Sequence, residues 1–155
     1  MAKASYQDLL TLPATGPLFG QLALRDLVLP DLLGVETSSI LYWAGRALAA
    51  KLPVAEPDIA ALFEKMGFGT LAPESAKKNE RHYTLSGSVV ETRIQNFDEP
   101  DFRLEAGFLA QSLQQVLGVV AEANPVVDRR KKVVALTVVL DLKAPQPTAE
   151  HPIAL

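Results

Sequence analysis

The sequence contains no cysteine, and this absence excludes several kinds of chemistry at once. A chain without thiols forms no disulfide, zinc knuckle or iron–sulfur site, and it offers no thiolate nucleophile and no S-acylation site. Histidine is nearly as scarce, with only His82 in a strand-like segment and His151 in a proline-rich tail. Neither has a second histidine three or four residues away with which to build a metal face. We therefore expect no metal, no haem and no other cofactor.

A strong charge of one sign and a long apolar run are also missing. The 155 residues include 15 basic and 18 acidic side chains, for a formal charge of −3. This balance supplies no overall field for a polyanion, so nucleic acid is not an expected partner. The most apolar stretch, residues 40–52, is interrupted by Arg46 and Lys51. It is well short of the roughly 20 residues that span a bilayer, and no secretory signal precedes it, so we expect a cytoplasmic protein without a membrane span.

The composition is that of one folded domain. Hydrophobic residues make up 48% of the chain and charged residues 21%, which is enough apolar surface for a single core. We expect a flexible N-terminal segment over residues 1–17 and a single domain over 18–143. The remaining residues, 144–155, contain three prolines and are expected to form an extended or disordered tail.

The hydrophobic periodicity predicts both helices and strands. Apolar residues at helical spacing, with their stop signals, predict helices over 18–29, 40–52, 56–66 and a segment through 108–117, which end near Pro30 or Gly34, Pro53, Gly67 and Gly118. Alternating residues predict a hairpin of 70–77 with 81–91, and strand-favouring residues on either side of a basic turn predict a second, of 119–128 with 133–142. The order is three helices, a hairpin, a helix and a hairpin. It predicts an α+β fold with helices packed on one face of a four-stranded antiparallel sheet.

No catalytic constellation is visible in the linear order. The carboxylates Asp98, Glu99, Asp101 and Glu105 lie where a helix begins, so we interpret them as groups that cap its free amides. Ser86-Gly87-Ser88 falls inside a strand pattern rather than in a nucleophile elbow, and no phosphate-cradling glycine loop is present. An enzyme survives only as an arrangement hidden from the sequence, such as a strand carboxylate near Arg93 or Arg103.

Two further segments have a structural and a functional interpretation. The basic run Arg129-Arg130-Lys131-Lys132 could contact phosphates, but without interleaved aromatic residues it is more typical of a solvated hairpin tip. Residues 40–52 are apolar on nearly every side, which predicts a helix surrounded by protein. Tyr42 and Trp43 face different sides of it, so either both pack in the core or one lines a cavity or a subunit interface. Gly45 and its neighbouring alanines offer a surface for close approach of another helix, from this chain or from a second copy.

Three strings in the sequence are distinctive as a set: Leu29-Pro30-Asp31-Leu32-Leu33-Gly34, Ile40-Leu41-Tyr42-Trp43-Ala44-Gly45-Arg46 and Leu104-Glu105-Ala106-Gly107-Phe108-Leu109-Ala110-Gln111. They resemble the YslB-like family of small uncharacterised bacterial proteins, and the resemblance covers about residues 18–142. The element order is also similar to that of 4-vinyl reductase domains and transport-protein-particle (TRAPP) subunits, which share a superfamily of ligand-binding α+β domains.

The resemblance to that superfamily is incomplete at one telling place. Its vinyl reductase members commonly carry cysteines after the fourth helix, and some TRAPP subunits hold an acyl chain on a cysteine. Residues 119–123 and the hairpin that follows carry none here. What the resemblance still implies is a noncovalent apolar pocket or a dimer surface.

These observations lead to one expected function and one alternative. We expect a non-catalytic domain that binds a small apolar molecule or a partner protein, as a homodimer. The candidates for lining an apolar pocket, taken from periodicity alone, are Tyr42, Trp43, Phe63 and Leu109. The alternative is a ligand-free dimeric structural or adaptor protein, and an enzyme with an unrecognised site is the third possibility.

Overall fold

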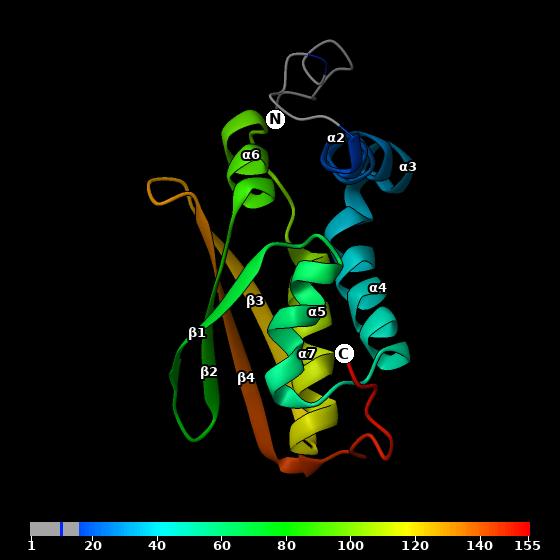
Figure 1. Cartoon of the computed structure of the whole chain (residues 1–155), viewed down its shortest axis with the longest axis vertical. Helices are drawn as coiled ribbons and strands as arrows, with labels where there is room; N and C mark the ends of the chain where they lie inside the picture. The colour runs from blue at the N-terminus through cyan, green and yellow to red at the C-terminus, as the bar shows by residue number, and fades with distance from the viewer. Residues whose placement is uncertain (1–9, 11–15) are drawn as a thin grey trace.

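Four antiparallel strands form one sheet, and helices cover one of its faces (Figure 1). The computed structural model describes residue 10 and residues 16–155, so most of the expected flexible segment 1–17 lies outside the described residues. The strands are β1 (Thr70–Ala76), β2 (Glu80–Ser86), β3 (Val119–Asp128) and β4 (Val133–Pro145), in the order β1-β2-β4-β3. The two predicted hairpins therefore meet through β2 and β4, and the α+β fold is confirmed.

The core lies between the sheet and two helices. Along β4, burial alternates with the pleat, because successive side chains point to opposite faces; the inward residues are Val134, Leu136, Val138 and Leu140. Against them pack α5 (Ile59–Lys65), which follows the short 3-10 helix η3 (Glu56–Asp58), and α7 (Arg103–Leu117). The rings of Phe63, Phe68 and Phe108 meet edge to face with centroids 5.4–5.6 Å apart and fill the centre of this layer.

The N-terminal helical segment changes its winding before Pro30. It consists of α2 (Gly16–Ala23), a π-helix η1 (Leu24–Val28), α3 (Leu29–Leu33) and a 3-10 turn η2 (Gly34–Glu36). Proline lacks an amide hydrogen and crowds the preceding turn, and the wider π-turn lies where that conflict would occur. Pro30 therefore does not end the helix, which stops at Gly34 with a φ of 63°.

One helix is missing from the sequence prediction. The alternating pattern predicts a strand over residues 81–91, but β2 ends at Ser86 and α6 spans Ser88–Asn96. Gly87, with a φ of 113°, makes the turn between them. The β-branched pair Val89 and Val90 favours a strand locally, yet both are buried together with Ile94, as a helical face requires. Tertiary packing of α6 overrides the local preference.

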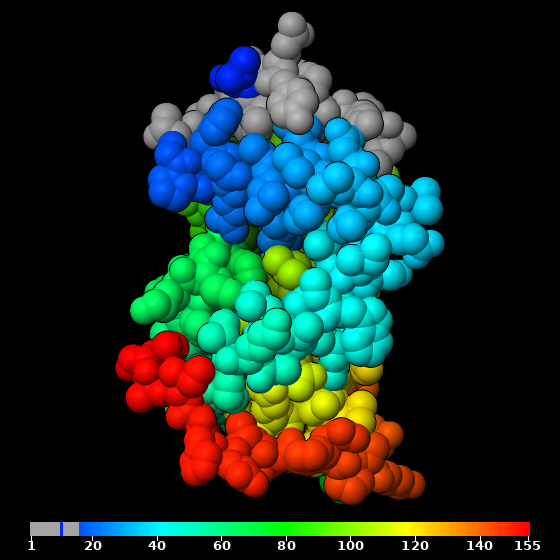
Figure 2. All heavy atoms as spheres, turned by 90° about the vertical axis from the view of Figure 1, so that its right-hand side faces the viewer, coloured from blue at the N-terminus to red at the C-terminus, as the bar shows by residue number. Residues whose placement is uncertain are grey.

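The helix α4 (Thr37–Lys51) packs along α7 and lies at the surface of the molecule, in cyan in Figure 2. The residues after β4 return toward the helices. Gln146 N donates to Gly118 O (2.8 Å), Ala149 N to Gln115 O (3.0 Å) and Ile153 N to Pro53 O (2.7 Å). The proline-rich tail thus makes backbone hydrogen bonds with the end of α7 and with the residue pair that follows α4.

Candidate functional site

The first face of α4 is in backbone contact with α7. A Cβ atom on Gly45 would lie 2.1 Å from Leu104 O, and one on Gly107 would lie 2.0 Å from Tyr42 O. Only glycine leaves room for two helices at this distance. The expected small-residue surface at Gly45 is therefore used by a helix of this same chain.

The second face of α4 covers the edge of the sheet. Ala123 N donates to Tyr42 Oη (3.1 Å), and Arg46 donates to Ala121 O (2.6 Å) and to Gln114 Oε1 (2.8 Å). The bonds to Ala123 N and Ala121 O satisfy backbone groups that an edge strand such as β3 otherwise leaves unpaired. Burial raises the pKa of Tyr42, and its hydrogen bond to the Glu122 carboxylate acts in the same direction. Tyr42 and Arg46 are thus anchors of β3.

The third face of α4 is open to solvent. Trp43 is 63% exposed and Ile40 is 43% exposed, and Ala44 and Ala47 beside them are also exposed. Residues three, four and seven apart share one side of a helix, so these four form one strip, which we name the α4 outer face. Leu32 and Val35, 74% and 98% exposed, precede it on α3 and η2.

The expectation that this helix is surrounded by protein is wrong for the single chain. Apolar residues on all sides predict burial, but α7 and β3 occupy only two sides. Trp43 is nevertheless held in a defined position. Its ring meets the Tyr42 ring edge to face with centroids 5.8 Å apart, and the Arg46 guanidinium carbon lies 5.7 Å from its centroid. A cation at this distance over an indole ring attracts it, so Arg46 helps to hold the exposed Trp43 ring in place.

The four expected pocket residues are not brought together. Phe63 and Leu109 are fully buried in the packed core, Tyr42 is half-buried at the edge of β3, and Trp43 faces outward. A shallow opening lies elsewhere, between η3 and the β1–β2 hairpin, and is lined by Glu56, Pro73, Glu74, Ser75, Ala76, Arg81, His82 and Tyr83. None of the four candidates lines it.

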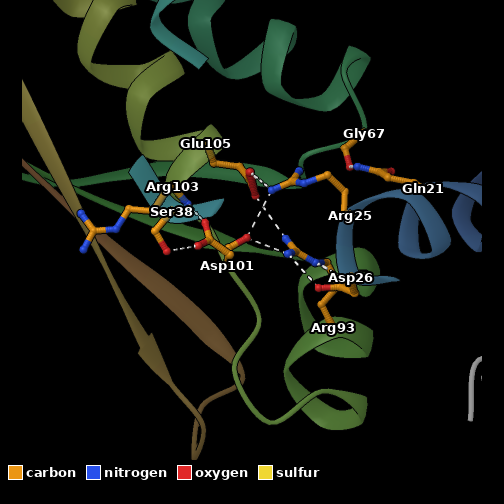
Figure 3. A network of polar contacts seen from close by, with 9 residues as sticks. All are labelled: Gln21, Arg25, Asp26, Ser38, Gly67, Arg93, Asp101, Arg103 and Glu105. Atoms are coloured by element: carbon orange, nitrogen blue, oxygen red, sulfur yellow. Dashed lines mark hydrogen bonds and ion pairs between the residues drawn. The ribbon is translucent and has the colours of Figure 1, made fainter. Parts of the chain in front are cut away.

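A buried charge cluster holds three helical segments together (Figure 3). It consists of Arg25 and Asp26 from η1, Arg93 from α6 and Glu105 from α7, with side chains only 1–5% exposed. Arg93 binds both carboxylate oxygens of Asp26 (2.9 and 3.1 Å) and lies 3.3 Å from Glu105, which also pairs with Arg25. Burial alone lowers the pKa of Arg93, but the two carboxylates outweigh it and raise the pKa.

Asp101 connects this cluster to the start of α7. Its backbone carbonyl accepts from Arg93 (2.6 Å) and Arg25 (3.2 Å), and its carboxylate accepts from Arg103 N (2.7 Å) and Ser38 Oγ. The predicted capping role is therefore confirmed for Asp101. It is wrong for Glu105, which is 1% exposed and neutralises two arginines. The sequence did contain a signal for this role, because Glu105 stands between Leu104 and Ala106 on the apolar side of the predicted helix.

The charged side chains of the buried charge cluster are paired with one another. The enzyme alternative named a strand carboxylate near Arg93, but the carboxylates that pair with Arg93 come from the helical segments η1 and α7, and they are buried with it. Within residues 16–155, no group of three or more histidine, aspartate or glutamate side chains is placed to hold a metal ion. In that same part of the chain, no helix is both long and apolar enough to cross a membrane.

One arginine of the basic turn between β3 and β4 makes hydrogen bonds within the fold. Arg129 donates to Ile94 O (2.7 Å), to Phe97 O (3.2 Å) and to Asp98 O. These carbonyls end α6 or follow it directly, where a cation is favourable. His82, on β2, lies 3.0 Å from Glu80 and opposite Thr137 of β4.

Comparison with known proteins places the chain in a family and a fold. A solved structure of a vinyl-4-reductase family protein from Methanocaldococcus jannaschii matches 86% of both chains with a TM-score of 0.56 and 22% identity, which shows a shared fold. The uncharacterised protein YslB of Bacillus subtilis is 43% identical over 123 residues, which are 79% of this chain and 83% of YslB. Residues 18–139 match the model of the family described as protein of unknown function DUF2507. The chain therefore belongs to the DUF2507 family, together with YslB.

Proposed function

We propose that this chain is a non-catalytic protein-binding domain, and that a protein partner covers the α4 outer face. The observation that carries the proposal is the 63% exposure of Trp43, the chain's one tryptophan, on a helix whose other two faces are fixed by α7 and β3. Isolated exposed apolar residues are common, but a continuous apolar strip on a rigid element is typical of an interaction site.

Burial of the α4 outer face by a partner would contribute several kcal/mol to binding, about 3 kcal/mol of it from Trp43. A tryptophan side chain buries about 150–250 Å² in a core or interface. With 63% of Trp43 exposed, covering it removes about 120 Å² from water and contributes about 3 kcal/mol at about 25 cal/mol per Å². Ile40, which is 43% exposed, adds to the same surface. Tryptophan at the centre of an interface is the usual arrangement of a binding hot spot.

The core gives less support to binding of a small apolar molecule. Phe63, Phe68 and Phe108 pack ring against ring where helices and sheet meet, and Leu109 is buried beside them. The charged side chains of the buried charge cluster form ion pairs with one another, so they are not available to bind a ligand. A protein partner on the outside requires neither an internal space nor a free reactive group.

Site-specific photo-crosslinking in cells of the source organism tests the proposal. A benzophenone amino acid replaces Trp43 in one variant and Val139 in a control variant. Val139 is also exposed, at 47%, but lies on the bare face of the sheet. We expect a protein adduct from position 43 and none from position 139. A third variant, with the benzophenone at Ala47, should lose its adduct when Trp43→Asp is added.

The pattern of adducts at positions 43, 47 and 139 decides whether the α4 outer face binds a protein. Protein adducts from positions 43 and 47, with loss of the position-47 adduct when Trp43→Asp is added, support a protein-binding α4 outer face. Absence of adducts at both positions, or equal adducts from position 139, would refute it. Circular dichroism of each variant checks that the fold is retained, which is expected because the substituted side chains are exposed.

A further inference from the structure

We infer that the partner on the α4 outer face is a second copy of this chain, with the two α4 helices packed antiparallel about a two-fold axis. The inference rests on the proposed function and names its partner. A two-fold interface requires a patch that is complementary to itself. The α4 outer face meets this requirement in the size of its side chains and in its charge.

The sizes of the side chains are complementary when the strip is reversed. The large residues Ile40 and Trp43 lie toward the start of α4, and the small residues Ala44 and Ala47 follow. With the two-fold axis between positions 43 and 44, Trp43 lies opposite Ala44 of the second copy. Ile40 then lies opposite Ala47 of that copy, so each large side chain meets a small one and the helices can approach closely.

The charges are complementary in the same register. Glu36 directly precedes α4 and Lys51 is its last residue, and both are exposed. Glu36 precedes Ile40 by four residues and Lys51 follows Ala47 by four, so the two charges lie on the side of the α4 outer face. The same axis places Glu36 of each copy beside Lys51 of the other. A parallel arrangement would instead place like charges together.

Neither charge forms an ion pair within the described residues. Among residues 16–155, the ion pairs of the structure involve other side chains, and neither Glu36 nor Lys51 takes part in one. The antiparallel arrangement also aligns the two helix dipoles favourably, with the positive end of each α4 beside the negative end of the other. Size, charge and dipole therefore select the same orientation.

Charge reversal tests the register. Glu36→Lys and Lys51→Glu each create two like-charge contacts in an antiparallel dimer, so each variant alone should dimerise about tenfold more weakly in sedimentation equilibrium. Mixed in equal amounts, the two variants should form a heterodimer about as stable as the native dimer, because both contacts become attractive again. Glu91→Lys is the control, because it makes an equal change of charge at an exposed position of α6, and it should leave dimerisation unchanged.

Crosslinking tests the position of the axis on a background without native cysteines. Ala44→Cys places two thiols beside the axis, and a short bismaleimide should link them. Ala50→Cys places them about 20 Å apart along the helices, at 1.5 Å per residue, and should not crosslink. Emission of the single tryptophan should move to shorter wavelength as concentration rises and the dimer covers it.

A native chain that sediments as a monomer at all concentrations overturns the inference. So does a dimer that Glu36→Lys and Lys51→Glu leave unchanged, because this outcome means another interface or a parallel arrangement. A Trp43-dependent photo-adduct to a different protein, combined with a monomeric native chain, leaves the proposed function standing and removes only the second copy. Loss of all adducts removes both.

Discussion

Adding one methyl group at the crossing of α4 and α7 should destabilise the protein severely. In Gly45→Ala the new Cβ would lie 2.1 Å from Leu104 O and 2.9 Å from Phe108 N, whereas ordinary contact begins at 3.4 Å. Both neighbours are backbone atoms of a helix and cannot rotate away as a side chain can. The two helices must therefore separate by about 1.3 Å at their closest point.

The cost follows from what the separation disrupts. Overpacking a core typically costs about 1–3 kcal/mol, and more where backbone must move. Alanine recovers about 1 kcal/mol through its better helix propensity. The shift also stretches the bonds from Tyr42 and Arg46 to β3. We therefore expect Gly45→Ala to lower the free energy of unfolding by about 2–4 kcal/mol, out of a total of about 5–15 kcal/mol.

Gly107→Ala probes the same crossing from the other helix, with its Cβ 2.0 Å from Tyr42 O. The double variant should cost less than the sum of the two single variants. Once one methyl group has separated the helices, the second meets less resistance, and neighbouring sites of this kind are not additive. A fully additive double variant would indicate two independent local distortions rather than one shared helix crossing.

Urea denaturation followed by circular dichroism measures these effects, and Gly20→Ala is the matched control. Gly20 also lies inside a helix, but nothing is within 4 Å of its Cβ position. It should be neutral or stabilise by up to about 1 kcal/mol. If Gly45→Ala is as stable as Gly20→Ala, the backbone contact between α4 and α7 is not as close as described.

Three further predictions concern other parts of the molecule. Arg93→Met leaves Asp26 without the partner of its two hydrogen bonds and should lower the free energy of unfolding by about 3–5 kcal/mol in urea denaturation. Arg25→Met should cost clearly less, because Glu105 still has its ion pair with Arg93. Burial raises the pKa of Tyr42, so its stabilising contribution is complete below about pH 10 and is lost as pH rises through the folded-state pKa. Tyr42→Phe should make the unfolding free energy fall less steeply above that pH, and an unchanged slope would contradict this. Arg129→Ala should cost about 1 kcal/mol and speed amide exchange in α6, while Arg130→Ala should change stability by less than about 0.5 kcal/mol.

The sequence predicts best where local chemistry and tertiary packing agree. The strand that begins at Val133 and the helix stops at Gly67 and Gly118 were correctly predicted, and Gly34 was the correct one of the two stops considered for the first helix, because each depends on neighbours within a few residues. The family strings around Tyr42-Trp43 and Gly107 were also informative. Their glycines now have a physical reason, which is the close approach of α4 and α7.

The candidate site could be predicted only in part. Adjacent Tyr42 and Trp43 left open whether both rings pack in the core or one of them leaves it, because the choice depends on where β3 presents its edge. The strand expected through residue 91 was wrong, since α6 forms to bury Val90 and to place Arg93 against Asp26. These two residues are 67 positions apart, and no local pattern connects them.

The amino-acid sequence by itself determined the class of fold, because hydrophobic periodicity and turn residues act over short distances along the chain. It also limited the available chemistry, since a chain without cysteine and with two histidines has few reactive groups. Tertiary structure alone decided that Glu105 neutralises two arginines and that Trp43 faces solvent. Burial and charge pairing depend on which distant segments meet, and a helix that is apolar on every side becomes an exposed surface when the fold covers only two of them.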